Sequence, residues 1–298
     1  MSEGAGRSYM IGGTEHRARP LDAALYLVAT PIGNLGDITL RALETLAAAD
    51  VVACEDTRVS RVLLDRYGIK RRTVRYHEHN SAEAGPRLIA DLEAGRSVAL
   101  ISDAGTPLIS DPGFRLADAA LAAGLRVIPI PGPSSPLAAL TASGLPSDAF
   151  FFAGFLPVKN GQRKTRLGDL AMVPGTLIFL ESPRRLAASL SSMTEVLGDR
   201  RAAVCRELTK AFEEVRTGTL AELAEHYRQA GAPKGEIVVC VGPPPEPKAE
   251  AAEDIDRILL SLADEMGASR AAAEAARITG GKKAELYRRL LELKDDAR

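Results

Sequence analysis

The sequence has few aromatic residues, no tryptophan and only three cysteines. Because aromatic residues make up 4% of the chain, any contact with nucleic acid would depend on phosphates more than on base stacking. Cys54, Cys205 and Cys240 are widely spaced, and each lies in an apolar run, which favours buried reduced thiols over a disulfide framework or a zinc knuckle.

The sequence also lacks a long apolar run and an excess of charge of either sign. No stretch is long and apolar enough to span a bilayer, and residues 1–20 lack the apolar segment of a secretory signal. We therefore expect a cytoplasmic protein without membrane association. The formal net charge of -1 excludes a uniformly basic coat for nucleic acid, although local basic patches are compatible with it.

With 298 residues, of which 46% are hydrophobic, the chain suits two domains and an appendage. The first series of expected strands covers 25–29, 51–54, 73–76, 98–102 and 126–130, and the helices between them cover 40–48, 59–67, 82–94 and 114–123. Apolar strands that alternate with helices predict a mostly parallel sheet covered on both faces. We assign an N-terminal α/β domain to residues 21–145, after a disordered leader at 1–20.

A second series of strands and helices predicts a second α/β domain over residues 146–242. Its expected strands are 150–155, 176–180, 202–206, 213–217 and 236–241, and its expected helices are 183–197 and 220–229. The polar, basic segment 157–165 is expected to be a mobile loop. A proline-rich linker at 243–253 precedes an all-helical extension at 254–298, which is either a helix-turn-helix-like unit or a helical tail that packs in a dimer.

Three polar loops follow strands of the N-terminal domain: ATPIGNL at 29–35, SDAGTPLISDPG at 102–113 and PIPGPSS at 129–135. Because the carboxyl ends of parallel strands meet at one edge of a sheet, we expect these loops to converge on a ligand. In the second loop, Asp103 and Gly105 are the expected ligand contacts, and Asp111 is expected to cap the next helix. Ser134 and Ser135 precede a helix, where hydroxyls and backbone N–H groups suit a carboxylate or phosphate.

These motifs together resemble the tetrapyrrole methylase superfamily, the class III S-adenosylmethionine-dependent methyltransferases. More closely, they resemble its ribosomal small-subunit RNA (cytidine-2′-O)-methyltransferase branch, through VATPIGNLGDIT, CEDTR, HEHN, ISDAGTPLISDPG, IPGPSS, FLESPRR, RELTKAFEE and KGEIVV. The resemblance covers residues 25–241, and the C-terminal helices resemble that branch's helix-turn-helix extension. Tetrapyrrole methylases usually have Gly-Gly-Asp-Pro where this chain has Ala104-Gly105-Thr106-Pro107, which argues against a porphyrinoid substrate.

The resemblance implies two α/β domains with S-adenosylmethionine in the cleft between them, a homodimer, and 16S rRNA or the small ribosomal subunit as substrate. Carried over by motif, the contacts to the cofactor are Pro31, Ile32, Gly33, Asp103, Gly105, Thr106, Ile109, Ser134, Ser135 and Leu180.

Methyl transfer to a ribose 2′-oxygen needs alignment and a proton acceptor but no metal. Asp56, His79 and Lys210 are the candidate catalytic residues. The alternatives are that Asp56 and Arg58 form a structural cap and ion pair, and that Lys210 is a solvated surface charge. His77 and His79 are two residues apart, but no further ligand is suitably spaced, so we expect no metal site.

Three basic runs predict a track for RNA phosphates, although solvated helix faces would give the same pattern. The candidates are Arg58, Arg61, Arg71, Arg72, Lys159, Arg163, Lys164, Arg184 and Arg185. Two rival functions remain open from the sequence: a methyltransferase for small tetrapyrrole-type molecules, and a non-catalytic RNA-binding assembly factor.

Overall fold

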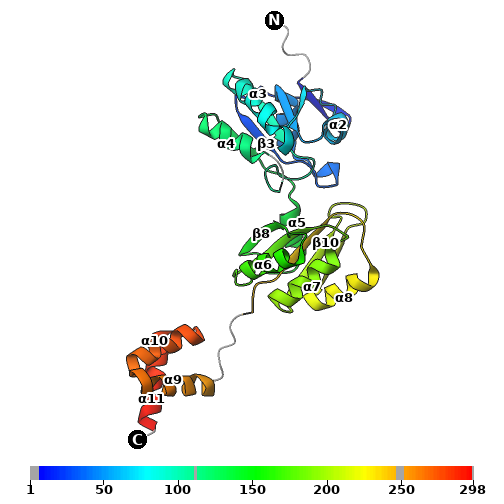
Figure 1. Ribbon diagram of the computed structural model, residues 1–298. Coiled ribbons are helices and arrows are strands. Elements are labelled where there is room, and N and C mark those ends of the chain that lie inside the picture. The colour runs from blue at the N-terminus through cyan, green and yellow to red at the C-terminus, as the bar shows by residue number, and fades with distance from the viewer. Residues whose placement is uncertain (1–6, 111–112, 246–251, 297–298) are drawn as a thin grey trace. The chain divides into compact units, whose positions relative to one another are not determined.

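The computed structural model describes residues 7–110, 113–245 and 252–296. The chain divides into two compact units, one ending at Pro243 and the other beginning at Pro244. The first unit contains two five-stranded sheets and an N-terminal hairpin, and the second contains three helices (Figure 1). In the described residues, no helix is long and apolar enough to cross a membrane.

The first sheet has the order β5–β4–β6–β3–β7, and all of its strand pairs are parallel, as the apolar strands predict. Its strands are β3 (Leu25–Val28), β4 (Val51–Cys54), β5 (Thr73–Arg75), β6 (Val98–Ile101) and β7 (Val127–Ile130). Helices α1 (Leu40–Ala48) and α2 (Thr57–Arg66) contribute to the core on one face. Helices α3 (Ser81–Glu93) and α4 (Phe114–Ala122) contribute to the core on the other face, so the covering of both faces is confirmed.

The second sheet is mixed, with the order β11–β10–β12–β9–β8. Only β8 (Phe150–Phe155) and β9 (Thr176–Glu181) pair in parallel. The antiparallel strands are β10 (Arg201–Arg206), β11 (Glu214–Thr219) and β12 (Ile237–Val241). Helices α6 (Asn160–Leu170), α7 (Leu186–Leu197) and α8 (Leu220–Ala230) bury leucines against one face of this sheet.

Helix α5 (Ser135–Ala142) connects the two sheets. It follows the last strand of the first sheet, but its Ala139 and Leu140 pack against Ile178 and Val238 of the second sheet. The loop that precedes α5 therefore passes directly from the ligand edge of the first sheet to a face of the second.

Two segments differ from the sequence predictions. Residues 8–17, expected to belong to a disordered leader, form a hairpin of β1 (Ser8–Ile11) and β2 (Thr14–Arg17) around Gly12 and Gly13. The buried ring of Tyr9 and a hydrogen bond from Met10 N to Tyr67 O attach this hairpin to the domain. Tandem glycines between two short strands are a hairpin signal, which the lack of an apolar run obscured.

The second difference is α6, which begins within the segment expected to be a mobile loop at 157–165. Polar residues dominate its first turns, so the hydrophobic pattern does not show it. The helix is nevertheless fixed, because Leu167 and Leu170 are buried and Arg163 is enclosed among hydrogen-bond acceptors. Asp111, which was expected to cap α4, lies outside the described residues; the N-cap position of α4 is Gly113.

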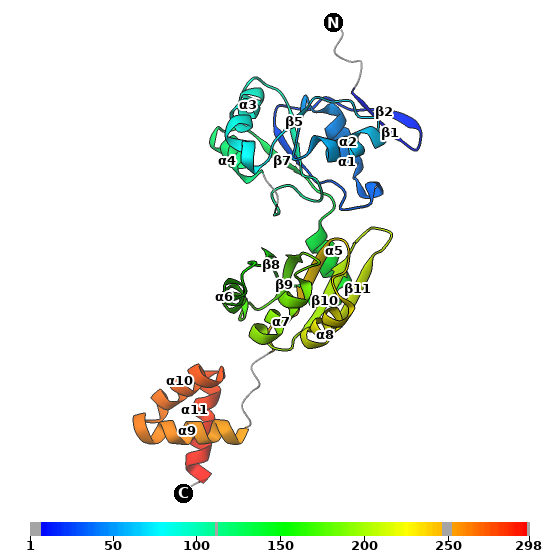
Figure 2. The same ribbon diagram turned by 45° about the vertical axis from the view of Figure 1, so that its right-hand side comes forward.

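The C-terminal unit is a three-helix assembly with its own core, which confirms the all-helical extension expected there (Figure 2). It consists of α9 (Ala252–Met266), α10 (Ala268–Thr279) and α11 (Lys283–Asp296). Leu259, Leu286 and Leu290 are buried between the helices, and Arg289 forms an ion pair with Asp256. A core of this kind lets so short a segment hold a defined shape.

Candidate cofactor site

Hydrogen bonds join the three polar loops at the carboxyl edge of the first sheet. Gly105 and Thr30 exchange two backbone hydrogen bonds, with N···O distances of 2.8 and 3.0 Å. The hydroxyl of Thr106 donates to the carbonyl of Pro133 over 3.1 Å. The first loop is thus tied to the second and the second to the third, so the convergence predicted from the strand order is confirmed.

These loops border a cavity of about 390 Å³ that the second sheet closes from the other side. We call it the cofactor cavity. Seven of the ten residues carried over by motif line it: Ile32, Gly105, Thr106, Ile109, Ser134, Ser135 and Leu180. The other three, Pro31, Gly33 and Asp103, line an adjoining hollow that shares Ile32, Ala104 and Glu236 with the cavity.

Several residues of the cavity wall were not singled out from the sequence. They come from the ends of β8, β9 and β12 and from the loop after β10: Phe155, Glu181, Ser182, Leu208, Glu236 and Val238. The motifs FLESPRR, RELTKAFEE and KGEIVV contain most of them. A signal was therefore present, but the sequence did not show which side chains of the mixed sheet face the first domain.

Strained backbone is concentrated in two loops beside the cavity. Among the described residues, the only non-glycine residues with positive φ are Leu108 and Ser110 in one loop and Glu207 and Thr209 in the other. Ser110 itself lines the cavity. Such conformations are costly and persist where the surrounding structure enforces them, most often at functional sites.

The cavity has the size and lining that a nucleoside-containing cofactor requires. Its volume lies within the range of small-molecule sites, about 300–1,000 Å³. Ile32, Leu180 and Val238 supply apolar surface, while Ser134 and Ser135 place hydroxyls at the N-terminus of α5. This combination suits an adenosyl group together with a charged amino-acid part, so S-adenosylmethionine fits the residues present.

Lys210 lies beside the first loop and is held by two carboxylates. Its Nζ donates to Glu207 over 2.8 Å and to Glu236 over 2.9 Å, and its side chain is 26% exposed. The chain passes so close to Gly33 that a Cβ at that glycine would lie 2.5 Å from Lys210 Cε. Burial lowers the pKa of Lys210, but the hydrogen bonds to the two carboxylates outweigh it and raise the pKa overall. Lys210 is thus a fixed cation rather than a solvated charge.

Asp56 caps α2, as the structural alternative anticipated. Its carboxylate accepts from the backbone N–H of Arg58 over 2.8 Å and pairs with the Arg58 guanidinium at 2.6 Å. These contacts lower the pKa of Asp56 to about 2. A carboxylate with so low a pKa is a weak base at neutral pH, so the geometry favours the cap over proton transfer.

His79 lies in the short 3-10 helix Glu78–Asn80 and lines a neighbouring hollow of about 820 Å³ together with Asp56, Glu55 and Asp103. This hollow shares Ser110 with the cofactor cavity. Burial and the nearby Asp103 raise the pKa of the Glu55 carboxyl. His77 Nδ1 is buried and has no hydrogen-bond partner in the described part of the chain. Within that same part, no group of three His, Cys, Asp or Glu side chains is arranged to hold a metal ion.

The structure changes the expected set of RNA contacts. Arg163 is 6% exposed and binds Ser192, Val158 and Asn160, so it is an internal structural residue and the RNA-binding prediction is wrong there. Arg185 also points inward, to Leu156 and Glu181. Lys164 pairs with Glu195, and Arg71 is partly buried. The candidates with exposed side chains are Arg58, Arg61, Arg72, Lys159 and Arg184. All three cysteines are free and buried, as expected.

Comparisons with known proteins give the family. The model described as "Tetrapyrrole (Corrin/Porphyrin) Methylases" matches residues 24–224. The chain belongs to this family. A second model, "RsmI C-terminal HTH domain", matches residues 249–294 of this tetrapyrrole methylase family member.

Curated relatives are similar over nearly the whole length of this methylase. "Ribosomal RNA small subunit methyltransferase I" of Mesorhizobium japonicum is 74% identical over 96% of this chain and 97% of its own. The protein of the same name from Pseudomonas aeruginosa is 48% identical over 90% of this chain and 96% of its own. Among solved structures, a uroporphyrin-III C-methyltransferase from Thermus thermophilus complexed with S-adenosylhomocysteine has a TM-score of 0.51 and 22% identity, over 73% of this chain and 96% of its own. This last likeness shows the shared fold.

Proposed function

We propose that the protein transfers a methyl group from S-adenosylmethionine to the ribose 2′-hydroxyl of a cytidine in the decoding region of 16S rRNA, and that it acts as a homodimer. The observation that carries the proposal is the convergence of three hydrogen-bonded loops on one cavity lined by seven of the ten residues expected to contact the cofactor. The name of the curated relatives, which specifies the RNA of the small ribosomal subunit, supports this substrate class.

When bound, S-adenosylmethionine supplies a methyl group that is already activated by the positive charge on sulfur. What the chain must do is exclude water, hold the cofactor and align the ribose oxygen. The apolar wall of Ile32, Leu180 and Val238 excludes water, and the hydroxyls of Ser134 and Ser135 orient the polar end of the cofactor.

Lys210 and His79 have the two remaining roles in this proposal, a fixed positive charge and a proton acceptor. Lys210 stays protonated because Glu207 and Glu236 hold it, so its role is to orient a phosphate or the 2′-hydroxyl. His79 lines the hollow that also contains Asp103, and it is the candidate left to accept the proton, because Asp56 pairs with Arg58 and Lys210 pairs with two carboxylates. Asp56 contributes by capping α2 and fixing the start of that helix.

The RNA would approach across the exposed cations of the first and second domains. Arg61 and Arg72 are exposed on the N-terminal domain, and Lys159 and Arg184 are exposed on the second. Because phosphate contacts release counterions, we expect affinity for RNA to fall steeply with salt while affinity for the cofactor changes little.

The decisive experiment maps 2′-O-methyl groups by mass spectrometry on small-subunit RNA from cells with and without this protein. We expect one methylated cytidine to disappear when the protein is absent and to return when the purified protein and S-adenosylmethionine are added. Assays with free 16S rRNA and with assembled subunits then identify the preferred substrate. An unchanged methylation map would overturn the RNA proposal.

Calorimetry with S-adenosylmethionine and a methyl-transfer assay on a tetrapyrrole, run beside this experiment, test both rival functions. If the protein binds S-adenosylmethionine but methylates only tetrapyrroles, it is a small-molecule enzyme. If it binds the RNA but not the cofactor, it is an assembly factor that retained the fold.

A further inference from the structure

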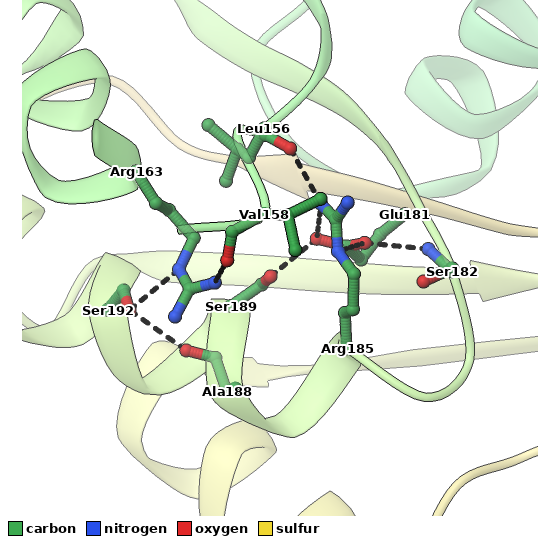
Figure 3. Close-up of polar contacts among 9 residues, drawn as sticks. All are labelled: Leu156, Val158, Arg163, Glu181, Ser182, Arg185, Ala188, Ser189 and Ser192. Carbon is green, nitrogen blue, oxygen red and sulfur yellow. Dashed lines mark hydrogen bonds and ion pairs between the residues drawn. The ribbon is translucent and has the colours of Figure 1, made fainter. Parts of the chain in front are cut away.

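A buried ion pair lies directly behind the cofactor cavity, at the end of β9. The side chain of Glu181 is 1% exposed and pairs with the guanidinium of Arg185. Arg185 Nη2 donates a hydrogen bond to Glu181 Oε2 over 3.2 Å. Arg185 Nε lies 3.0 Å from Glu181 Oε1, but this contact does not have the geometry of a hydrogen bond. Glu181 also accepts hydrogen bonds from the backbone N–H of Ser182 and from the hydroxyl of Ser189. A buried carboxylate is tolerated only with such partners, so these groups constrain one another (Figure 3).

Arg185 connects this carboxylate to a second strand. The guanidinium nitrogen that contacts Glu181 also donates to the carbonyl of Leu156 over 2.7 Å. Leu156 follows directly on β8, whose pairing with β9 shifts register between Phe152 and Gly154. The regular strand ladder is therefore interrupted near this end, and Arg185 holds the ends of β8 and β9 together (Figure 3).

The two strand ends held by Arg185 form one side of the cofactor cavity. Phe155 at the end of β8 lines the cavity, as do Leu180, Glu181, Ser182 and Pro183 at the end of β9. We propose that Glu181, Arg185 and Ser189 are positioning residues that hold this wall in the shape required to bind S-adenosylmethionine. This inference rests on the proposed function of the cavity.

A second buried arginine in the same domain provides a matched control. Arg163 on α6 donates to Ser192 on α7, to the carbonyl of Val158 and to Asn160, with distances between 3.0 and 3.3 Å. Figure 3 shows both arginines against helix α7, each with one serine of that helix in its network. None of the residues bound by Arg163 lines the cofactor cavity.

The test compares two pairs of variants, Arg185→Lys with Arg163→Lys and Ser189→Ala with Ser192→Ala. Lysine keeps the charge, but its single ammonium cannot reproduce the planar fork that reaches both Glu181 and Leu156. The Kd of S-adenosylhomocysteine is measured by calorimetry at a temperature where circular dichroism shows each full-length variant to be folded. The KM for S-adenosylmethionine and kcat are measured on RNA of the small subunit.

We expect Arg185→Lys to raise the Kd about tenfold and Ser189→Ala about threefold, as the loss of hydrogen bonds to a charged group predicts. The KM for the cofactor should rise by similar factors, while kcat at saturating cofactor stays close to that of the unchanged protein. Arg163→Lys and Ser192→Ala should lower the Tm without changing either binding constant.

The inference would be overturned if the Kd of S-adenosylhomocysteine were the same for the unchanged protein, Arg185→Lys and Ser189→Ala. It would also be overturned if the Arg163→Lys control lost as much affinity as Arg185→Lys. If Arg185→Lys does not fold, the serine pair alone decides between the same outcomes. Failure of the unchanged protein to bind either form of the cofactor would instead refute the proposed function of the cavity.

Discussion

The two sides of the cofactor cavity are built in different ways. On the first domain, backbone contacts hold the wall in place: Gly105 and Thr30 are paired by main-chain hydrogen bonds, and Gly105 has a φ of 80°. On the second domain, charged side chains hold the wall in place. Arg185 pairs with Glu181 of the wall, and Lys210, which lines the adjoining hollow, pairs with Glu207 and with Glu236 of the wall. All-parallel strands deliver loops to one edge, whereas a mixed sheet has no such edge and relies on side chains.

This difference predicts which substitutions each side tolerates. We call the wall of the first domain the backbone side: cofactor binding and methyl transfer should weaken when a Cβ is added there, but not when a charge is removed. We call the wall of the second domain the side-chain side: binding or methyl transfer should weaken when a charge or a hydrogen-bond donor is removed there. Three sets of variants test the comparison, from the largest expected effect to the smallest.

Lys210→Met should have the largest effect, because it removes the cation that two carboxylates hold beside the first loop. We expect methyl transfer to fall about a hundredfold through loss of alignment, while the Kd of the cofactor changes less than about threefold. Single-turnover kinetics and calorimetry give the two quantities. Lys164→Met, which removes a cation paired with Glu195, is the matched control and should retain its rate.

The pH dependence of Lys210 sharpens this test. Because folding raises the pKa of Lys210, its charge stabilises the fold fully at any pH below the pKa of the unfolded state. This stabilisation is lost only as the pH rises through the pKa of the folded state. From about pH 7 to pH 9, more than one unit below the ordinary lysine pKa of about 10.4, the charge is therefore nearly constant, and Lys210→Met should lower the rate by nearly the same factor throughout this range. A factor that shrinks with rising pH in this range would show that Lys210 loses its proton there.

Gly105→Ala should have an intermediate effect, confined to the backbone side. The new Cβ would lie 3.4 Å from Ile32 Cγ2 and adopt a left-handed conformation at φ 80°. We expect the Kd of S-adenosylhomocysteine to rise about tenfold. The left-handed conformation costs a residue with a Cβ ~1–2 kcal/mol, and here that residue lines the cavity. The control is Gly124→Ala, with φ 72° and open space around it, which should lower the Tm alone. Similar Kd changes in the two variants would contradict the local explanation.

Asp56→Asn should have the smallest effect, because this charged pair belongs to the backbone side and serves as a helix cap. We expect the rate of methyl transfer to stay within about threefold of the unchanged protein, since capping is local. The lowered pKa of about 2 means that the charge of Asp56 stabilises the fold above its unfolded pKa and loses this effect as pH falls toward 2. Acid unfolding of Asp56→Asn followed by circular dichroism should therefore begin at a slightly higher pH. A large loss of rate near neutral pH would instead restore Asp56 as a catalytic residue.

Much of the first domain followed from the sequence because its signals are local. Apolar strands and helices alternate along the chain, and parallel strands bring their loops to one edge by geometry alone. Ile32, Gly105 and Ser134 were therefore placed correctly beside one cavity. The hairpin at Gly12 and Gly13 was missed because β2 is polar and exposed, so no apolar run marks the pair of strands.

Only the tertiary structure decided which role each charged side chain has. Arg163 and Arg185 occupy basic runs that resemble a surface for RNA, yet both point into the domain. Ser192 on α7 lies within reach of Arg163, and Glu181 at the end of β9 lies within reach of Arg185. Asp56 and Lys210 had the same ambiguity, and their partners resolved it: one caps a helix and the other is clamped beside Gly33. A sequence fixes hydrophobic periodicity and loop position, since these depend on neighbours along the chain. The environment of a charged side chain depends on residues that are distant in sequence, and only the packed fold brings them together.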